Sequence, residues 1–309
     1  MEYKHKPVLE TELVGFLPLK ENIVFVDGTL GGGGHSKSLL KKFARKKIKC
    51  KIIGIDRDLE AIFAAKKNLA DFKDKMIYIH DNFSNIEEIL KSQGVSKIDG
   101  IFLDLGVSSY QLENDNRGFS FQTDSPLDMR MDQDDDLTAG EIINYYDEKS
   151  LANLFYNYGE ERYSRSIARK ITNARKTKLI KSTFELVEII KSATPPKYRF
   201  PDKKNPNKKI HFATRVFQAL RIEVNSELNE LKAVIEKAVN LLNVGGEIII
   251  ISFHSLEDRI VKHSFKAICE KEPEKFTILT KKPITATAEE IAINPRSRSA
   301  KLRAIKKIK

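Results

Sequence analysis

A run of glycines between two short elements is the feature of this chain whose spacing most clearly predicts chemistry. Residues 27–36 read DGTLGGGGHS, and the four glycines 31–34 remove every Cβ from a turn between a predicted strand and a predicted helix. A ligand can therefore approach backbone N–H groups at the positive end of that helix. A phosphate-binding P-loop is disfavoured, because Gly34 and His35 stand where that motif needs Lys and Ser or Thr.

Three further positions fit a nucleoside ligand bound at the same edge of a sheet. Asp56 lies about 25 residues beyond Gly31, where a carboxylate accepts hydrogen bonds from ribose hydroxyls, in NAD and S-adenosylmethionine sites alike. Phe83 offers a ring face to a base, with Asp81 or Asn82 beside it for the base edge. Asp104, at the end of the next predicted strand, is the carboxylate placed to meet the reactive part of the ligand.

Four β-branched runs alternate with amphipathic segments in the first third of the chain. We predict strands at Ile23–Asp27, Lys51–Asp56, Met76–His80 and Ile98–Asp104, with helices between them. Strand, helix and strand at this spacing predict right-handed crossovers and a parallel sheet covered on both faces. The fold class is thus α/β, with a Rossmann-like doubly wound sheet.

This rhythm stops after Asp104 and resumes about a hundred residues later. We predict a discontinuous ligand-binding domain of residues 1–110 and 210–309, and a mainly helical insertion at 111–209. One long helix is expected from Ala213 to Leu242, ended by the segment 243–246. A buried strand should follow at 246–253, then a helix with capping-box spacing at Ser255 and Asp258, and two last strands within 276–280 and 300–308.

Composition excludes several classes of protein. The 309 residues are 41% hydrophobic and hold only two cysteines, which argues against disorder, a disulfide framework and a zinc site, and favours a cytoplasmic protein. No apolar run approaches the roughly 20 residues that span a bilayer, so no membrane association is expected. A net charge of +11 suggests a polyanionic partner. The charge is concentrated, with 15 Lys and Arg against 3 acids in residues 162–209 and 7 against none in residues 296–309.

Three histidines leave alternatives open. His254 could begin a helix or face the substrate. His211 and His5 could be ligands, although isolated histidines are more often hydrogen-bonded parts of the structure.

Taken together, several strings resemble one family closely, the bacterial small-subunit ribosomal RNA cytosine-N4 methyltransferases known as RsmH or MraW. They run through the whole chain and are HKPVL at 5, DGTLGGGGHS at 27, GIDRD at 54, DLGVSS at 104, RGFSF at 117, PLDMRMD at 126, GEERYSRSIA at 159, ATRVFQALRI at 213, ISFHSLEDRIVK at 251 and NPRSRSAKLR at 294.

The resemblance implies a class I, S-adenosylmethionine-dependent methyltransferase with an inserted helical domain that recognises the substrate. It implies action on a cytosine in the decoding centre of 16S rRNA, within the small ribosomal subunit or a late precursor. No metal is implied, and a homodimer is compatible with the family. Carried over residue by residue, the cofactor contacts are Gly33, Gly34, His35, Asp56, Phe83, Asp104 and Gln111. The two basic segments would then form a platform for RNA.

Transfer to an exocyclic amine needs alignment of the nitrogen with the methyl group and an acceptor for an amine hydrogen. Asp104 is our hypothesis for that acceptor, with Ser108, Ser109 or a main-chain carbonyl as competitors. Methylation at cytosine carbon-5 would need a cysteine nucleophile, and neither Cys50 nor Cys269 is placed for it. Three competing functions are a DNA amino-methyltransferase, whose Pro-Pro-aromatic motif is missing here, an NAD-dependent oxidoreductase, and a non-catalytic RNA-binding module.

Overall fold

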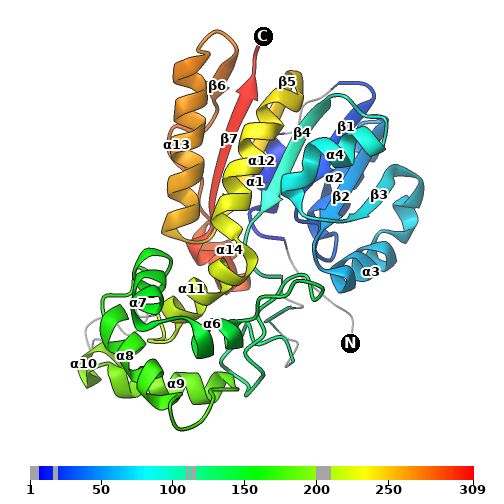
Figure 1. Cartoon of the computed structure of the whole chain (residues 1–309). Coiled ribbons are helices and arrows are strands. Elements are labelled where there is room, and N and C mark those ends of the chain that lie inside the picture. Colours follow the sequence, from blue (N-terminus) through cyan, green and yellow to red (C-terminus); the bar gives the residue numbers. More distant parts are fainter. Residues whose placement is uncertain (1–6, 17–19, 109–110, 113–115, 200–209) are drawn as a thin grey trace. The chain divides into compact units, whose positions relative to one another are not determined.

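Two compact units make up the chain. The computed structural model describes residues 7–16, 20–108, 111–112, 116–199 and 210–309 (Figure 1). One unit is formed by Met1–Ser108 with Leu228–Lys309, and the other by Ser109–Glu227. Among the described residues, no helix combines the length and the apolar character needed to cross a membrane.

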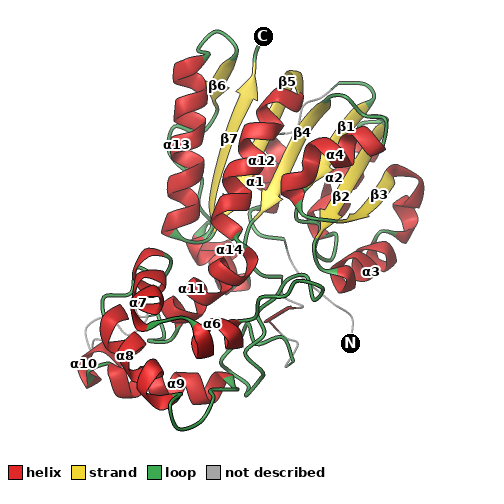
Figure 2. Ribbon diagram, in the orientation of Figure 1, coloured by secondary structure: helices red, strands yellow, loops and turns green. Residues whose placement is uncertain are grey.

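A seven-stranded sheet forms the centre of the first unit (Figure 2). Its strand order is β3-β2-β1-β4-β5-β7-β6, and neighbours pair in parallel from β3 to β5, whereas β7 runs antiparallel to both β5 and β6. The strands are β1 (Ile23–Asp27), β2 (Cys50–Asp56), β3 (Met76–His80), β4 (Ile98–Asp104), β5 (Leu242–Ser252), β6 (Phe276–Ile278) and β7 (Lys301–Lys307). This is the α/β fold with a doubly wound sheet that the sequence predicts.

Helices cover both faces of the sheet, because successive strand residues point to opposite sides. Phe25 and Ile52 pack with α1 (Glu10–Gly15), α2 (Gly34–Arg45) and α3 (Leu59–Asn68). Their neighbours Val26 and Ile53 pack with α4 (Ile86–Ser92), α12 (Glu227–Leu241) and α13 (Ser255–Lys271), which lie in front of the sheet in Figure 1. The remaining short elements of this unit are η1 (Ala70–Lys75), η2 (Phe83–Asn85), α14 (Ala288–Ile293) and η4 (Pro295–Ser299).

The strand order reverses direction at β1, which has β2 on one side and β4 on the other. Because these strands are parallel, their carboxyl ends meet at one edge, and ligands of doubly wound sheets bind outside such a reversal. Asp27, Asp56 and Asp104 are the last residues of β1, β2 and β4. The fold therefore gathers three carboxyl groups at the edge where the sequence predicts the ligand.

The second unit is mainly helical. It contains α6 (Ala139–Tyr145), α7 (Glu148–Asn157), α8 (Ser164–Ala174), α9 (Thr183–Ala193), α10 (Pro196–Arg199) and α11 (Thr214–Asn225). The acidic loop before α6, residues 126–136, is held by buried Arg117, whose Nη2 donates to the carbonyls of Arg130 and Met131, 3.0 Å from each. Asn225 also holds this loop, because its side chain accepts a hydrogen bond from Met131 N and donates one to Met129 O.

The prediction of one helix from Ala213 to Leu242 is wrong. Ser226 takes a left-handed conformation with φ of 51°, which ends α11 before α12 begins. The apolar stripe runs through the break because both helices bury residues at helical spacing, and serine gives little sign of this conformation. The second compact unit extends to Glu227, because side chains of α11 bond to the acidic loop and to Tyr158, the residue that follows α7.

Two smaller expectations also need correction. The helix does end before residues 243–246, at Leu241, but these residues already belong to β5, which begins at Leu242 and not at Gly246. They form an irregular start of the strand, where the register against β4 shifts and Gly245 has φ of 85°. The capping box of α13 starts at His254, not Ser255: His254 Nδ1 accepts from Glu257 N, and Glu257 Oε2 accepts from His254 N. The preference of Ser over His at helix starts misled the prediction by one residue.

Candidate active site

The glycine-rich turn follows β1 and is hydrogen-bonded to the ends of two further strands, β2 and β4. Gly28 N donates to Phe102 O at 2.9 Å, and Leu30 N donates to Ile55 O at the same distance. Thr29 Oγ1 accepts from the main-chain N–H of Asp104 at 2.6 Å. These bonds draw the turn across β2 and β4 before α2 begins.

Position 33 requires glycine because its backbone is left-handed and because there is no room for a side chain. Its φ is 77°, and an added Cβ would lie 2.7 Å from Leu69 Cδ1. Gly33 precedes the first residue of α2, Gly34, so the unbonded N–H groups of the first turn of this helix follow directly. This geometry matches the predicted ligand cradle.

Two of the three strand-end carboxyl groups are satisfied by the turn. Asp27 Oδ2 accepts from Ser36 Oγ at 2.7 Å, and burial raises the pKa of Asp27 to about 6. Asp56 Oδ2 accepts from Gly31 N at 2.7 Å, and its Oδ1 accepts from Asp58 N at 2.9 Å. Burial likewise raises the pKa of Asp56 to about 6. An ionised carboxylate has about four acceptor positions, so Asp56 can order the turn and still bind two hydroxyls.

The third carboxyl group, Asp104, is not satisfied. Its Oδ1 is buried and has no hydrogen-bond partner within the described part of the chain. Burial, followed by the nearby charges of Asp27 and Glu257, raises the pKa of Asp104 well above its ordinary value. A buried acceptor without a donor is costly. This carboxyl group is therefore arranged for a donor or a cation brought by a ligand.

His35 restricts the protonation of Asp104. Its Nε2 lies 2.9 Å from Val8 O, and since a carbonyl only accepts, Nε2 must carry a hydrogen. In the neutral ring the Nδ1 lone pair then faces Asp104 Oδ2 at 3.6 Å. Two acceptors at this separation repel each other unless one of them is protonated. This contact therefore favours the protonated form of Asp104, in agreement with the raised pKa of its carboxyl group.

The other predicted contacts are distributed between the two units. Phe83 is half-buried near the start of the turn, with its Cβ 3.3 Å from where a Cβ on Gly28 would stand. Gln111 is buried in the second unit. The structure thus brings Gly33, Gly34, His35, Asp56, Phe83 and Asp104 to the carboxyl edge of one sheet, whereas Gln111 remains a predicted contact.

The remaining candidates have structural roles or lie elsewhere. His254 begins α13, as one of the two alternatives predicted. His211 stacks on Phe121, with ring centroids 4.5 Å apart, and burial lowers its pKa. His5 lies outside the described residues. Cys50 opens the strand that Asp56 ends, so at about 3.3 Å per residue it is roughly 20 Å from the carboxyl edge, and Cys269 is late in α13.

Sequence reasoning missed the residues that hold the carboxyl groups in place. Thr29 and Ser36 stand inside the glycine motif without a predicted role of their own, yet both bond to strand-end aspartates. The available signal was their position beside a carboxylate that ends a buried strand. The sequence analysis also gave no role to Glu257. Its buried carboxylate accepts from the N–H of His254 and completes the capping box of α13.

Comparison with known proteins decides the family. The model of the MraW methylase family matches residues 2–308. The chain belongs to this family. It is 50% identical to Ribosomal RNA small subunit methyltransferase H of Clostridium botulinum (strain Loch Maree / Type A3), with 100% of both chains covered. It is 47% identical to the protein of the same name from Kosmotoga olearia, over 98% of this chain and 97% of the relative.

A member of this family is a methyltransferase that uses S-adenosylmethionine, and the residues described above fit that donor. Asp56 has acceptor positions left for ribose hydroxyls. Asp104 Oδ1 would face cationic or N–H groups. The glycine turn presents backbone without side chains, and Phe83 offers its ring. When bound, the donor supplies a methyl group made electrophilic by its sulfonium.

We predict that Asp56 makes donor binding pH-dependent. Because its pKa is raised to about 6, the carboxylate is lost as the pH falls through that value, and the dissociation constant should rise roughly tenfold from pH 7 to pH 5. Asp56→Asn should weaken binding at pH 7 and flatten this dependence. Titration calorimetry with S-adenosylmethionine measures both effects.

Asp71→Asn is the matched control for this experiment. Asp71 is exposed on η1, so this substitution removes the same charge at a position outside the glycine-rich turn. It should bind the donor as the unchanged protein does. Equal pH profiles for Asp56→Asn and the unchanged protein would contradict the assigned role of Asp56.

Proposed function

We propose that this chain transfers a methyl group from S-adenosylmethionine to the exocyclic N4 of a cytosine in the decoding centre of 16S rRNA. The substrate class follows from the relatives, whose printed name is Ribosomal RNA small subunit methyltransferase H. The choice of an amine as the methyl acceptor depends on one observation at the carboxyl end of β4: Asp104 Oδ1 is buried and has no partner among the described residues.

An exocyclic cytosine amine is a weak nucleophile because its lone pair is delocalised into the ring. Asp104 Oδ1 can accept one amine hydrogen, which favours a tetrahedral nitrogen with its lone pair directed at the methyl group. As the new N–C bond forms and the C–S bond breaks, the nitrogen becomes acidic and releases a proton. The carboxylate of Asp104 is placed to receive that proton. Alignment contributes the larger part, up to about 7–11 kcal/mol of the barrier.

The raised pKa of Asp104 agrees with this role. With no ligand, desolvation and the neighbouring acids favour its protonated form. A nearby positive charge favours the ionised form instead. The sulfonium of the donor would therefore convert Asp104 into a proton acceptor only when the donor is present.

The competing acceptors for this proton are weaker. Ser108 is half-buried at the end of the first unit, and Ser109 lies outside the described residues. A hydroxyl with an ordinary pKa is a poorer proton acceptor than a carboxylate. Methylation at carbon-5 would require a cysteine nucleophile near the carboxyl edge of the sheet. Cys50 is at the opposite end of β2 and Cys269 is in α13, so neither is placed for it.

The second unit supports an RNA substrate through its charges. Arg162, Arg165 and Arg169 are exposed and spaced three and four residues apart, so they share one side of α8 and its preceding turn. Cations in a row on a rigid helix suit a phosphate backbone. We propose that this unit recognises RNA in the small subunit or a late precursor, in the cytoplasm. The lysines at 203, 204, 208 and 209, part of the predicted platform, lie outside the described residues.

The first test of this function is transfer to ribosomal RNA. Small subunits from cells that lack the protein should gain one methyl group when incubated with the protein and labelled S-adenosylmethionine. Mass spectrometry of RNA fragments should place that group on N4 of one cytosine. Label on carbon-5, in duplex DNA or in no nucleic acid would refute the proposal.

The second test addresses Asp104. At saturating donor, Asp104→Asn should lower kcat by about 10²-fold or more, because the amide keeps an acceptor oxygen but cannot take a proton. For the unchanged protein, kcat should rise with pH as Asp104 ionises, and the variant should lose that slope. Asp74→Asn, an exposed change of equal charge, should retain full turnover. Full turnover in Asp104→Asn would show that the carboxylate is not required.

A further inference from the structure

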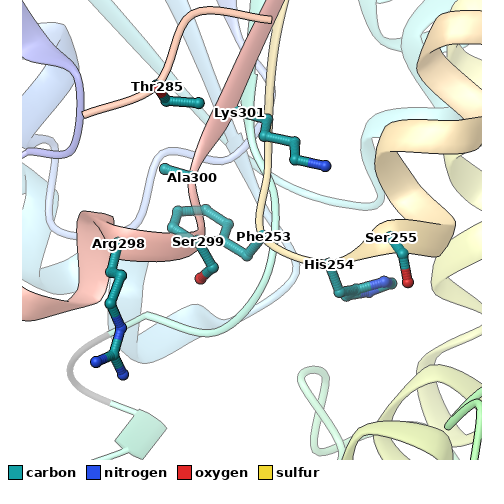
Figure 3. Close-up of a pocket in the computed structure, with 8 residues that line it drawn as sticks. All are labelled: Phe253, His254, Ser255, Thr285, Arg298, Ser299, Ala300 and Lys301. Atoms are coloured by element: carbon teal, nitrogen blue, oxygen red, sulfur yellow. The ribbon is translucent and has the colours of Figure 1, made fainter. Parts of the chain in front are cut away.

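A pocket of about 250 Å³ opens beside the end of β5 in the first unit (Figure 3). Its lining combines one aromatic ring with hydroxyls and cations, and no carboxylate is among the lining residues. They are Phe253, His254, Ser255, Thr285, Arg298, Ser299, Ala300 and Lys301. This donor set is suited to an anion with an attached apolar or sugar group.

Backbone pairing places the pocket near the end of β4, where Asp104 lies. Ile251 of β5 is the register partner of Asp104, and Leu105 N donates to Ile251 O at 3.0 Å. Phe253 follows two residues later, and an added Cβ at Gly106 would lie 3.6 Å from its Cδ2. A ligand group in this pocket would therefore be a near neighbour of any base presented to Asp104.

Among the cations of the C-terminal segment that line this pocket, Arg298 is the one that forms no ion pair with another described residue. The resemblance implies an RNA platform that includes the basic C-terminal segment, but half of that segment, residues 301–307, is strand β7, and four of the strand's residues are buried. Arg303 Nε bonds to Asp258 Oδ1 at 2.6 Å, and Lys306 Nζ to Glu247 Oε1 at 3.0 Å. Arg298 is exposed on η4, with no ion pair or hydrogen bond to another described residue.

Lys301 can still donate hydrogen bonds to a ligand. Its Nζ lies 3.1 Å from Asp258 Oδ2, and an ammonium has three donors. Asp258 is shared by Lys301 and Arg303, so this group of three carries a net positive charge. Glu257 is buried and occupied with capping α13. The first turn of α13 holds both of these acids, so its helix dipole is not counted as a binding group.

We propose that this pocket binds the sugar–phosphate backbone of the RNA strand next to the methylated base, with Arg298 and Lys301 contacting different phosphates. The inference rests on the proposed function and names part of its substrate site. Phe253 would pack against a ribose, and the hydroxyls of Ser255 and Ser299 would donate to phosphate oxygens.

Two observations favour a strand over a small free anion. Figure 3 shows Arg298 and Lys301 on opposite sides of Ser299 and Phe253, with their charged ends directed apart. One phosphate could not engage both without a change of rotamer, whereas a backbone passing over the pocket meets them in turn. The volume is also below the roughly 300–1,000 Å³ usual for whole small-molecule ligands, so it suits one segment of a longer chain.

The test compares Arg298→Ala with Arg45→Ala. Arg45 is exposed at the end of α2, so its removal changes the net charge equally at a different place. With unmethylated small subunits, Arg298→Ala should raise the KM for subunits about tenfold, the worth of one charge-assisted contact. It should lower the slope of log KM against log salt by about 0.7–0.9. Donor affinity and Tm should be unchanged, and Arg298→Lys should restore part of the loss.

Each outcome decides the proposal. If Arg298→Ala and Arg45→Ala show the same subunit KM and salt slope, the pocket inference is overturned while the proposed function stands. If the unchanged protein transfers no methyl group to ribosomal RNA, the pocket inference and the proposed function are both overturned. Inorganic phosphate at constant ionic strength tests the other source of the anion: millimolar phosphate binding that depends on Arg298 but leaves the KM for subunits unchanged would assign the pocket to a free anion and overturn the strand assignment.

Discussion

The site depends on the cost of burying carboxyl groups at the ends of adjacent parallel strands. Asp27, Asp56 and Asp104 all end strands at one edge of the sheet, and burial raises the pKa of each. Such groups are tolerated when hydrogen bonds offset the loss of water. The glycine-rich turn supplies those bonds to Asp27 and Asp56, through Ser36 and Gly31. Asp104 Oδ1 receives none from the described residues, so the same packing that orders the turn leaves one acceptor ready for a ligand.

Much of this edge could be predicted from the sequence, because each feature is local. Strand residues were recognisable as short β-branched runs that end in aspartate, and the bounds of β1, β3 and β4 agree with the prediction. A glycine run between a strand and a helix predicts a ligand turn for the same reason. The bonds within the edge were not predictable, since Thr29 and Asp104 are far apart in sequence and meet only through the strand order.

The errors arise where one residue redirects the chain. Ser226 breaks the helical stripe with a single left-handed conformation, which periodicity of apolar residues does not record. The basic C-terminus was misjudged because net charge does not distinguish exposed cations from paired ones. Arg303 and Lys306 are committed to Asp258 and Glu247, whereas Arg298 is exposed. We therefore confine the proposed polyanion recognition by this segment to the pocket at the end of β5.

The buried Oδ1 of Asp104 is arranged for a cationic or hydrogen-donating partner. Its protonation can be followed directly by NMR of the ¹³C-labelled carboxyl groups, with Asp104→Asn used to assign the signal. We expect a pKa of Asp104 well above the ordinary value of about 3.9 in the free protein, and a clear fall of this pKa when S-adenosylmethionine binds. An ordinary pKa in the free protein, or no change on binding the donor, would contradict it.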